Sequence, residues 1–208
     1  MSEKPVLYCA PHTRSATAMF MDEELGRVCD IKLLNLEEGE AQKPAFLEIN
    51  PMAKVPTLVY RGVTVTEAAA ICAFLADLHP EKALAPASKD PMRGAYYRWL
   101  FFAPSVIEPM MLDKLGGIER ENAAAAGHGN YARVMKSIDQ AFASGPWLLG
   151  ETFSAADVVM GSTLNFAIMF STIPNEGPIK DYVQRIRERP AFQAMQTANA
   201  EAARAMGA

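Results

Sequence analysis

The stretch from Glu48 to Leu58 reads Glu-Ile-Asn-Pro-Met-Ala-Lys-Val-Pro-Thr-Leu, and the rest of the chain is organised around it. Both of its prolines lack an N–H and restrict the residue before them, so no helix continues through the stretch. The second, Pro56, directly precedes Thr57–Tyr60, a β-branched and aromatic run that is typical of a strand. Proline is tolerated at the first residue of a strand, and a tight approach of this kind can use a cis X-Pro bond. We therefore expect a turn that leads into a strand.

The first 80 residues around this stretch alternate between strand and helix patterns. One helix ends at Gly26, a short one covers 44–49, and a third, over 68–78, carries apolar residues at i, i+3, i+4 and i+7. The order is βαβαββα, with crossover helices first and a hairpin afterwards, which predicts a mixed α/β sheet of thioredoxin-like arrangement. Four strands are expected, at Val6–Cys9, Cys29–Leu34, Thr57–Tyr60 and Val63–Val65.

The second half of the chain reads as helix throughout. A linker over 81–90 has little periodicity, and Asp90-Pro91 then supplies an N-cap followed by a proline, a common start of a helix. Pro104 and Pro109 should bend or divide the first long helix of this half. We therefore expect an α/β domain over 1–80, the linker, and an all-α domain over 91–208.

One local motif in the helical half is specific. Ser154 precedes an apolar helix and Asp157 follows three residues later, which predicts a capping box. The Asp157 carboxylate can accept from the Ser154 N–H, and it also lies favourably at the positive end of the helix. Both residues are assigned a structural role.

Composition excludes several classes of function. The chain has 208 residues, half of them hydrophobic, and a net charge of −4 with scattered basic residues, so no nucleic-acid surface is expected. The apolar stretch over 153–173 is interrupted by polar residues and reads as a buried helix, because a membrane span needs about 20 predominantly apolar residues. Its three cysteines are widely spaced, which argues against a disulfide framework or a zinc site. We expect a soluble cytoplasmic protein without metal.

The pattern Asn-Pro-x-x-Lys-Val-Pro-x-Leu, followed by Thr66-Glu67-Ala68, resembles the N-terminal domain of glutathione transferases. The segment from Gly150 to Asp157 resembles the start of the buried helix in the C-terminal domain of the same family. The resemblance covers nearly the whole chain. It implies a cis bond before Pro56, a homodimer, and glutathione as co-substrate with no other cofactor.

The resemblance also implies a set of glutathione-binding residues. The backbone of Val55 would pair with the cysteinyl part of glutathione, and the N-terminus of the helix beginning at Ala68 would bind its γ-glutamyl carboxylate. Glu67 would accept from the neighbouring ammonium. The family usually has serine where this chain has Ala68, so a hydroxyl contact worth roughly 1 kcal/mol is missing. The full expected set is Gln42, Lys43, Lys54, Val55, Pro56, Glu67 and Ala68.

In this family the turn between the first strand and first helix carries the residue that stabilises the glutathione thiolate. A thiol of pKa about 8.5 is only a few per cent ionised at pH 7, so a donor raises the concentration of the nucleophile. We rank Ser15 and Thr13 together first, then Tyr8, then Arg14 as a helping cation. Ser15 and Thr13 can equally cap the helix, and Tyr8 can equally pack inward. Cys9 on the first strand is expected to behave as a small hydrophobe.

Aromatic and sulfur-containing residues cluster between positions 96 and 111. Most of them must be core, but the corresponding helices of the resembled family also form the wall of a hydrophobic second-substrate site, and methionines adapt to varied ligands. The candidates are Tyr96, Trp99, Phe102 and Met110. The expected activity is conjugation of glutathione to a small hydrophobic electrophile. The alternatives are another glutathione chemistry, such as disulfide reduction or ether cleavage, and a member that binds a ligand or protein without catalysis.

Overall fold

The computed structural model describes residues 4–120, 123–142 and 145–207. The chain forms two compact units: unit 1 contains the chain up to Lys82 together with the segment from Arg189 onward, and unit 2 covers Ala83–Glu188. The boundary between them falls inside the expected linker. The expected all-α domain over 91–208 differs from this division at its C-terminal end, because the closing helix packs in unit 1. There the ring of Phe192 meets that of Phe20 edge-on at 5.2 Å.

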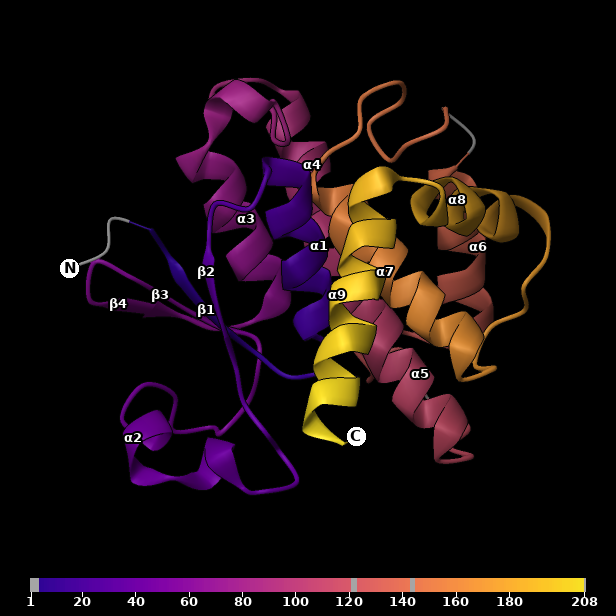
Figure 1. Ribbon diagram of the computed structural model, residues 1–208. Coiled ribbons are helices and arrows are strands. Elements are labelled where there is room, and N and C mark those ends of the chain that lie inside the picture. Colours follow the sequence, from indigo (N-terminus) through magenta and orange to yellow (C-terminus); the bar gives the residue numbers. More distant parts are fainter. Residues whose placement is uncertain (1–3, 121–122, 143–144, 208) are drawn as a thin grey trace. The chain divides into compact units, whose positions relative to one another are not determined.

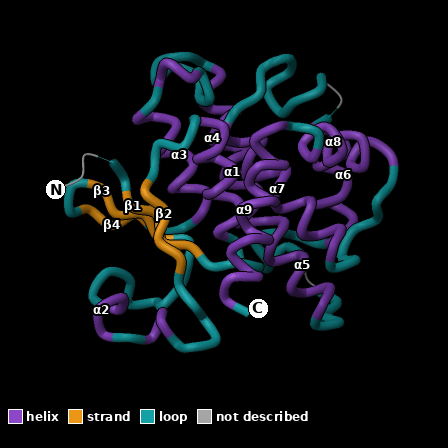
Figure 2. The backbone as a smooth tube through the Cα atoms, viewed as in Figure 1, coloured by secondary structure: helices purple, strands orange, loops and turns teal. Residues whose placement is uncertain are grey.

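Unit 1 has the expected βαβαββα order, with the closing helix added (Figures 1 and 2). Its sheet has the strand order β2-β1-β3-β4, in which β2 is parallel to β1 while β3 and β4 are antiparallel to their neighbours. This confirms the mixed sheet. The strands are β1 (Val6–Cys9), β2 (Asp30–Leu33), β3 (Thr57–Tyr60) and β4 (Val63–Val65), and the helices are α1 (Ser15–Leu25), α2 (Pro44–Leu47), α3 (Ala68–Leu78) and α9 (Pro190–Met206), with single 3-10 turns at Glu40–Gln42 and Pro80–Lys82.

The two faces of this sheet are covered differently. Figure 1 shows α1 and α3 on one side and α2 on the other. Leu7 and Cys9 of β1 are fully buried on the side of α1 and α3, and the alternating Tyr8 points to the opposite face, where its ring meets Phe46 of α2 at 5.4 Å. The observed β2 is one residue shorter at each end than the predicted Cys29–Leu34, and all four of its residues are exposed, because β2 lies at an edge of the sheet.

Unit 2 is helical, as predicted. Its helices are α4 (Met92–Phe102), a π-helical turn over Ala103–Ile107, α5 (Glu108–Leu115), α6 (Tyr131–Ala141), α7 (Ala155–Met169) and α8 (Gly177–Arg187). Pro104 lies in the π-helical turn and Pro109 is the second residue of α5, so the prolines divide the long helix as expected. Helix α7 is buried along most of its length. Among the described helices, none combines the length and the apolar character that crossing a membrane requires.

Candidate functional site

The predicted glutathione-binding residues of unit 1 converge at one end of its sheet, where β1 finishes and β3 begins. Strand register pairs Tyr8, near the end of β1, with Thr57, the first residue of β3. The next pairing joins Leu58 of β3 to Val65, the last residue of β4. The turn after β1, the bond before β3 and the segment leading into α3 therefore lie at the same end of the sheet. Topology brings together three segments that are distant in sequence.

The turn that enters β3 contains a cis Val55-Pro56 bond, as the resemblance implied. A buried amide holds this turn. Asn50 Nδ2 donates to the Lys54 carbonyl and to Thr57 Oγ1, each at 2.9 Å, while its Oδ1 accepts from the Met52 N–H. Thr57 Oγ1 donates in turn to the Lys54 carbonyl at 2.8 Å. Asn50 and Thr57 are almost fully buried, so water does not compete for these bonds.

Glu67 and the start of α3 form the second part of the site at this end of the sheet. Glu67 has φ 64° and ψ 119°, a conformation that costs a non-glycine residue energy and that clusters at ligand sites. Its side chain is exposed, and within the described residues no hydrogen bond or ion pair engages its carboxylate. The first N–H groups of α3, beginning with Ala68, have no partner inside the helix. A free carboxylate and free N–H donors thus lie side by side, a pairing that suits an ammonium next to a carboxylate.

The turn after β1 is held together by the two predicted hydroxyls. Ser15 is fully buried, and its Oγ accepts from the Ala10 N–H at 3.1 Å. Thr13 Oγ1 lies 2.7 Å from the Ala10 carbonyl and 2.9 Å from Ser15 Oγ, and it accepts from the Ser15 N–H. Thr13 is only partly buried. Thr13 therefore keeps some exposed surface while Ser15 is enclosed, and the single hydrogen of the Thr13 hydroxyl is donated to the Ala10 carbonyl or to Ser15 Oγ.

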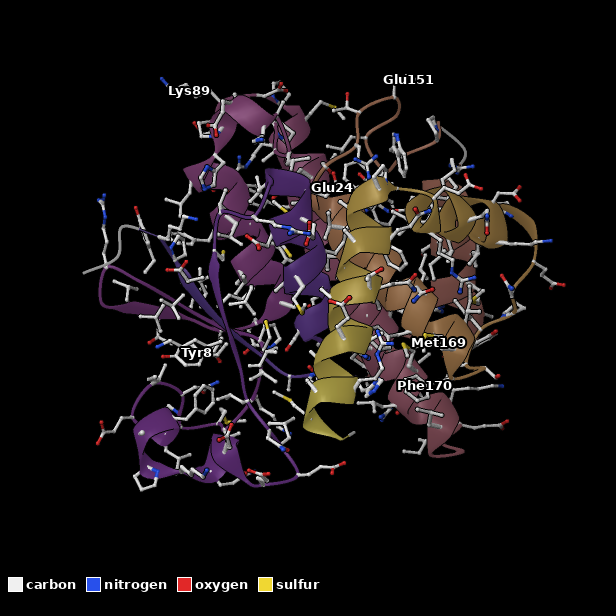
Figure 3. All side chains as sticks on the ribbon, in the orientation of Figure 1. Tyr8, Glu24, Lys89, Glu151, Met169 and Phe170 are labelled. Atoms are coloured by element: carbon white, nitrogen blue, oxygen red, sulfur yellow. The ribbon has the colours of Figure 1, made fainter. Side chains whose placement is uncertain are left out.

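The remaining catalytic candidates differ in position. Tyr8 lies on the face of the sheet where α2 lies (Figure 3), and the ammonium of Lys32 is 5.4 Å from its ring centroid. Arg14 directly precedes α1. Cys9 is fully buried, and burial raises the pKa of its thiol to about 12, so the thiolate is not populated at neutral pH. Burial also raises the pKa of the Cys29 and Cys72 thiols.

The three predicted helper residues are all exposed. Gln42 and Lys43 lie in the segment that follows β2. Because β2 is parallel to β1, it finishes at the same end of the sheet as β1. The ammonium of Lys43 is 3.4 Å from the Glu40 carboxylate, an exposed pair of small energetic value. Lys54 enters through its carbonyl in the turn described above, while its side chain extends into solvent. Their contact with glutathione stays a prediction.

Three of the four predicted substrate-site residues are core residues of unit 2. Tyr96, Trp99 and Met110 are 0%, 6% and 2% exposed, and only Phe102 of the four is half-buried. Phe102 meets Trp99 edge-on, with ring centroids 5.4 Å apart. The periodic aromatic pattern therefore reports packing, and contact of these residues with a substrate stays a prediction.

Sequence reasoning did not find a pocket of about 370 Å³ in unit 2. Met110 and Tyr131 line it, together with a polar cluster centred on Asp113. The Asp113 carboxylate accepts from Arg120 through both oxygens and lies 2.7 Å from His128 Nε2. The Arg120 guanidinium holds the pKa of this carboxyl below its usual value. These charges are paired with one another, in residues too far apart in sequence to form a recognisable motif.

The predicted capping box is present at the start of α7. The Asp157 carboxylate accepts from the Ser154 N–H and hydroxyl, and also from the Leu148 N–H and the Tyr182 hydroxyl, at 2.9–3.0 Å. The last two bonds were not foreseen, and they join α7 to a loop and to α8. Burial nevertheless raises the pKa of Asp157 to about 6, because the loss of hydration outweighs the four donors.

Comparison with known proteins agrees with this geometry. A sequence model described as "Glutathione S-transferase, N-terminal domain" matches residues 18–78. A probable maleylacetoacetate isomerase of Caenorhabditis elegans is 31% identical over 211 residues, which cover 92% of this chain and 92% of that protein. The chain belongs to the glutathione S-transferase family.

Other members of this family align over almost the whole chain. The crystal structure of a glutathione transferase from Methylococcus capsulatus str. Bath has a TM-score of 0.79 at 27% identity and covers 94% of this chain and 98% of its own. Disulfide-bond oxidoreductase YfcG of Escherichia coli (strain K12) is 27% identical over 205 residues, 89% of this chain and 91% of that protein. The comparisons confirm the predicted family and fold, and they include proteins named for different reactions.

Asn50 and Thr57 are the residues whose part in the site the sequence analysis missed. Both lie in the motif on which the resemblance rested, seven positions apart, so a signal was present. An asparagine before a proline and a short loop reads locally as a turn former. Nothing in the local pattern shows that its amide reaches forward to the bond before β3.

Proposed function

We propose that this protein is a glutathione transferase that conjugates the glutathione thiolate to a small hydrophobic electrophile. The observation that carries the proposal is the set of groups at the end of the unit 1 sheet where β1 finishes and β3 begins. There the backbone of Val55, the exposed carboxylate of Glu67 and the N-terminus of α3 form three complementary groups for one peptide. A short peptide with an ammonium and a carboxylate at one end matches this arrangement.

In this proposal each part of glutathione has a partner. The γ-glutamyl carboxylate accepts from the Ala68 N–H at the positive end of α3, and its ammonium donates to Glu67. The cysteinyl backbone pairs with Val55 in the manner of an added strand. Gln42, Lys43 and Lys54 are the expected helpers for the remaining carboxylate. The missing hydroxyl at Ala68 makes the γ-glutamyl contact weaker than a serine would.

The sulfur is stabilised as the thiolate by the turn after β1. Thr13 is the foremost candidate, since this residue is partly exposed while Ser15 is fully buried, and its hydroxyl would turn from the Ala10 carbonyl to donate to the sulfur. A donated hydrogen bond favours the ionised sulfur and so lowers the pKa of the thiol. The thiolate then attacks an electrophilic carbon, a carbon–sulfur bond forms, and the leaving group departs with its electron pair. The thiol proton goes to solvent, so no metal or redox cofactor is needed.

A second candidate is glutathione-dependent disulfide reduction, because a relative aligned over 89% of the chain is named for that reaction. In the described part of the chain all three cysteines are buried with raised thiol pKa values. Exchange through a cysteine of the protein is therefore disfavoured, and glutathione itself would have to supply both thiols. Isomerisation of a maleyl compound is a third reaction to assay, given the name of the nematode relative.

The test measures binding and turnover separately. Calorimetry with reduced glutathione should give saturable binding, and 1-chloro-2,4-dinitrobenzene should be conjugated at a rate that saturates with glutathione. Hydroxyethyl disulfide and maleylacetone assay the two other reactions in parallel. Absence of glutathione binding would contradict the proposal. Binding without turnover on the whole panel would instead support a member that binds ligands without catalysis.

Assembly and compartment follow from the family resemblance as further parts of the proposal. We expect a homodimer that works in the cytoplasm. Sedimentation at micromolar concentration tests the first, and fractionation of cells that express the protein tests the second.

A further inference from the structure

In the turn before β3, buried hydrogen bonds of Asn50 and Thr57 hold the backbone next to Val55. We infer that Asn50, with Thr57, sets the direction of the Val55 N–H and thereby determines how tightly the cysteinyl backbone of glutathione binds. This inference rests on the proposed function and assigns a role to two residues that would not touch glutathione themselves.

The inference begins at the Lys54 carbonyl. It accepts two buried hydrogen bonds, from Asn50 Nδ2 at 2.9 Å and from Thr57 Oγ1 at 2.8 Å. Both donors belong to residues no more than 3% exposed. This carbonyl is therefore turned inward, toward the interior of the turn, and two bonds with little competition from water keep it there.

Peptide geometry carries the effect to Val55. The Lys54–Val55 bond is trans, and in a trans peptide the carbonyl and the N–H lie in one plane and point in opposite directions. A carbonyl fixed inward thus fixes the Val55 N–H outward. Within the described residues, neither the N–H nor the carbonyl of Val55 forms a hydrogen bond. A partly exposed backbone N–H aimed away from its own fold and left open suits pairing with a peptide.

Asn50 is suited to this task by its chemistry. Both hydrogens of its amide are used, one on the Lys54 carbonyl and one on Thr57 Oγ1, and its oxygen accepts from the Met52 N–H. Aspartate has the same shape and can keep the Met52 bond, but it has no hydrogens to donate. Without the bonds donated by Asn50, only Thr57 Oγ1 holds the Lys54 carbonyl, so the Lys54–Val55 peptide is held less firmly and the outward N–H is lost from part of the population.

The resulting loss has a signature that separates it from thiolate stabilisation. Because Asn50 and Thr57 act on backbone pairing, losing their bonds should weaken the binding of S-methylglutathione, which has no free thiol, as much as that of reduced glutathione. Loss of a residue that donates to the sulfur should weaken the binding of reduced glutathione only. Loss of the Asn50 or Thr57 contacts should likewise raise KM for glutathione while leaving kcat at saturating glutathione and the pKa of the bound thiol nearly unchanged.

The experiment compares Asn50→Asp with the wild-type protein by calorimetry against both ligands. We expect Kd to rise about tenfold for each, which corresponds to about 1.4 kcal/mol. Thr57→Val should give a smaller loss of the same kind because Asn50 still holds the carbonyl, and Thr57→Ser should restore wild-type affinity. These two variants keep the test decisive if Asn50→Asp does not fold.

Asp22→Ala is the matched control. Asp22 is also buried in unit 1, where its carboxylate accepts from the Cys29 N–H at 2.8 Å. That bond lies just before the start of β2, at the opposite end of the sheet. It should cost stability without changing Kd. Equal losses of affinity in Asp22→Ala and Asn50→Asp, or unchanged affinity in Asn50→Asp and Thr57→Val, would overturn the inference while the proposed function stands. A wild-type protein that binds neither ligand would overturn both.

Discussion

The buried carboxyl of Asp157 gives a prediction whose sign distinguishes two physical effects. Four hydrogen-bond donors and the positive end of α7 favour the ionised form, and burial disfavours it. If the donors dominate, the pKa falls below 3.8; the structure instead raises it to about 6, with desolvation as the largest cause. The same capping box can therefore either gain or lose strength as the pH rises.

The sign follows from counting protons. Between pH 3.8 and about 6, the folded protein keeps a proton on Asp157 that the unfolded chain has released. The folded state binds more protons in this interval, so the free energy of unfolding falls as the pH rises, and levels off above pH 6. The contribution is fully present below pH 3.8. From pH 4 to pH 7 the linkage relation gives a loss of about 2 kcal/mol attributable to this one group.

The assay compares the wild-type protein with Asp157→Asn in urea at pH values from 4 to 7. Asparagine does not titrate, so the wild-type stability relative to this variant should decline by about 2 kcal/mol over that range. Exposed Asp181→Asn, in α8 of the same unit, controls for the change in net charge. Direct NMR titration of the Asp157 carboxyl carbon should give a midpoint near 6. A stability difference that grows with pH, or a midpoint below 4, would refute the dominance of burial.

Three further predictions follow from individual contacts. Thr13→Ala should raise the pKa of the bound glutathione thiol by a unit or more, and Ser15→Ala should raise it by less, as measured by thiolate absorbance against pH. Equal or reversed shifts would contradict Thr13 as the donor. Gly161→Ala places a Cβ 2.6 Å from Ile186 Cγ1, so it should lower the free energy of unfolding by about 1–3 kcal/mol, measured by heat or urea. In an Ile186→Ala background the same change should be stabilising, and equal effects in both backgrounds would rule out this clash. Glu67→Gln should raise KM for glutathione about tenfold or more, with Glu201→Gln on α9 as the exposed control, and an unchanged KM would remove Glu67 from the site.

Local physics explains what could be predicted from the sequence. The strand at Val6–Cys9, the helix over 68–78 and the division of the long helix near Pro104 depend on periodicity and on the proline ring, which act within a few residues. The Ser154–Asp157 capping box is local for the same reason. The family itself followed from a short motif that includes Val55-Pro56.

Pairings between distant segments required the folded chain. The sequence could not show that α9 packs on α1, or that the aromatic pattern at Tyr96 and Trp99 is core, because both outcomes depend on which surfaces meet. Nor could it show that Ser15 is fully buried while Thr13 is only partly buried, since the two residues lie in one short turn.

The sequence by itself thus determined the elements, their order and the family, because backbone propensities and turn chemistry are set by neighbours along the chain. The tertiary structure decided the direction of the Val55 N–H, the raised pKa of Asp157 and the accessibility of the candidate hydroxyls. These properties depend on burial and on hydrogen bonds between segments. Both arise only when water is excluded by parts of the chain that fold together.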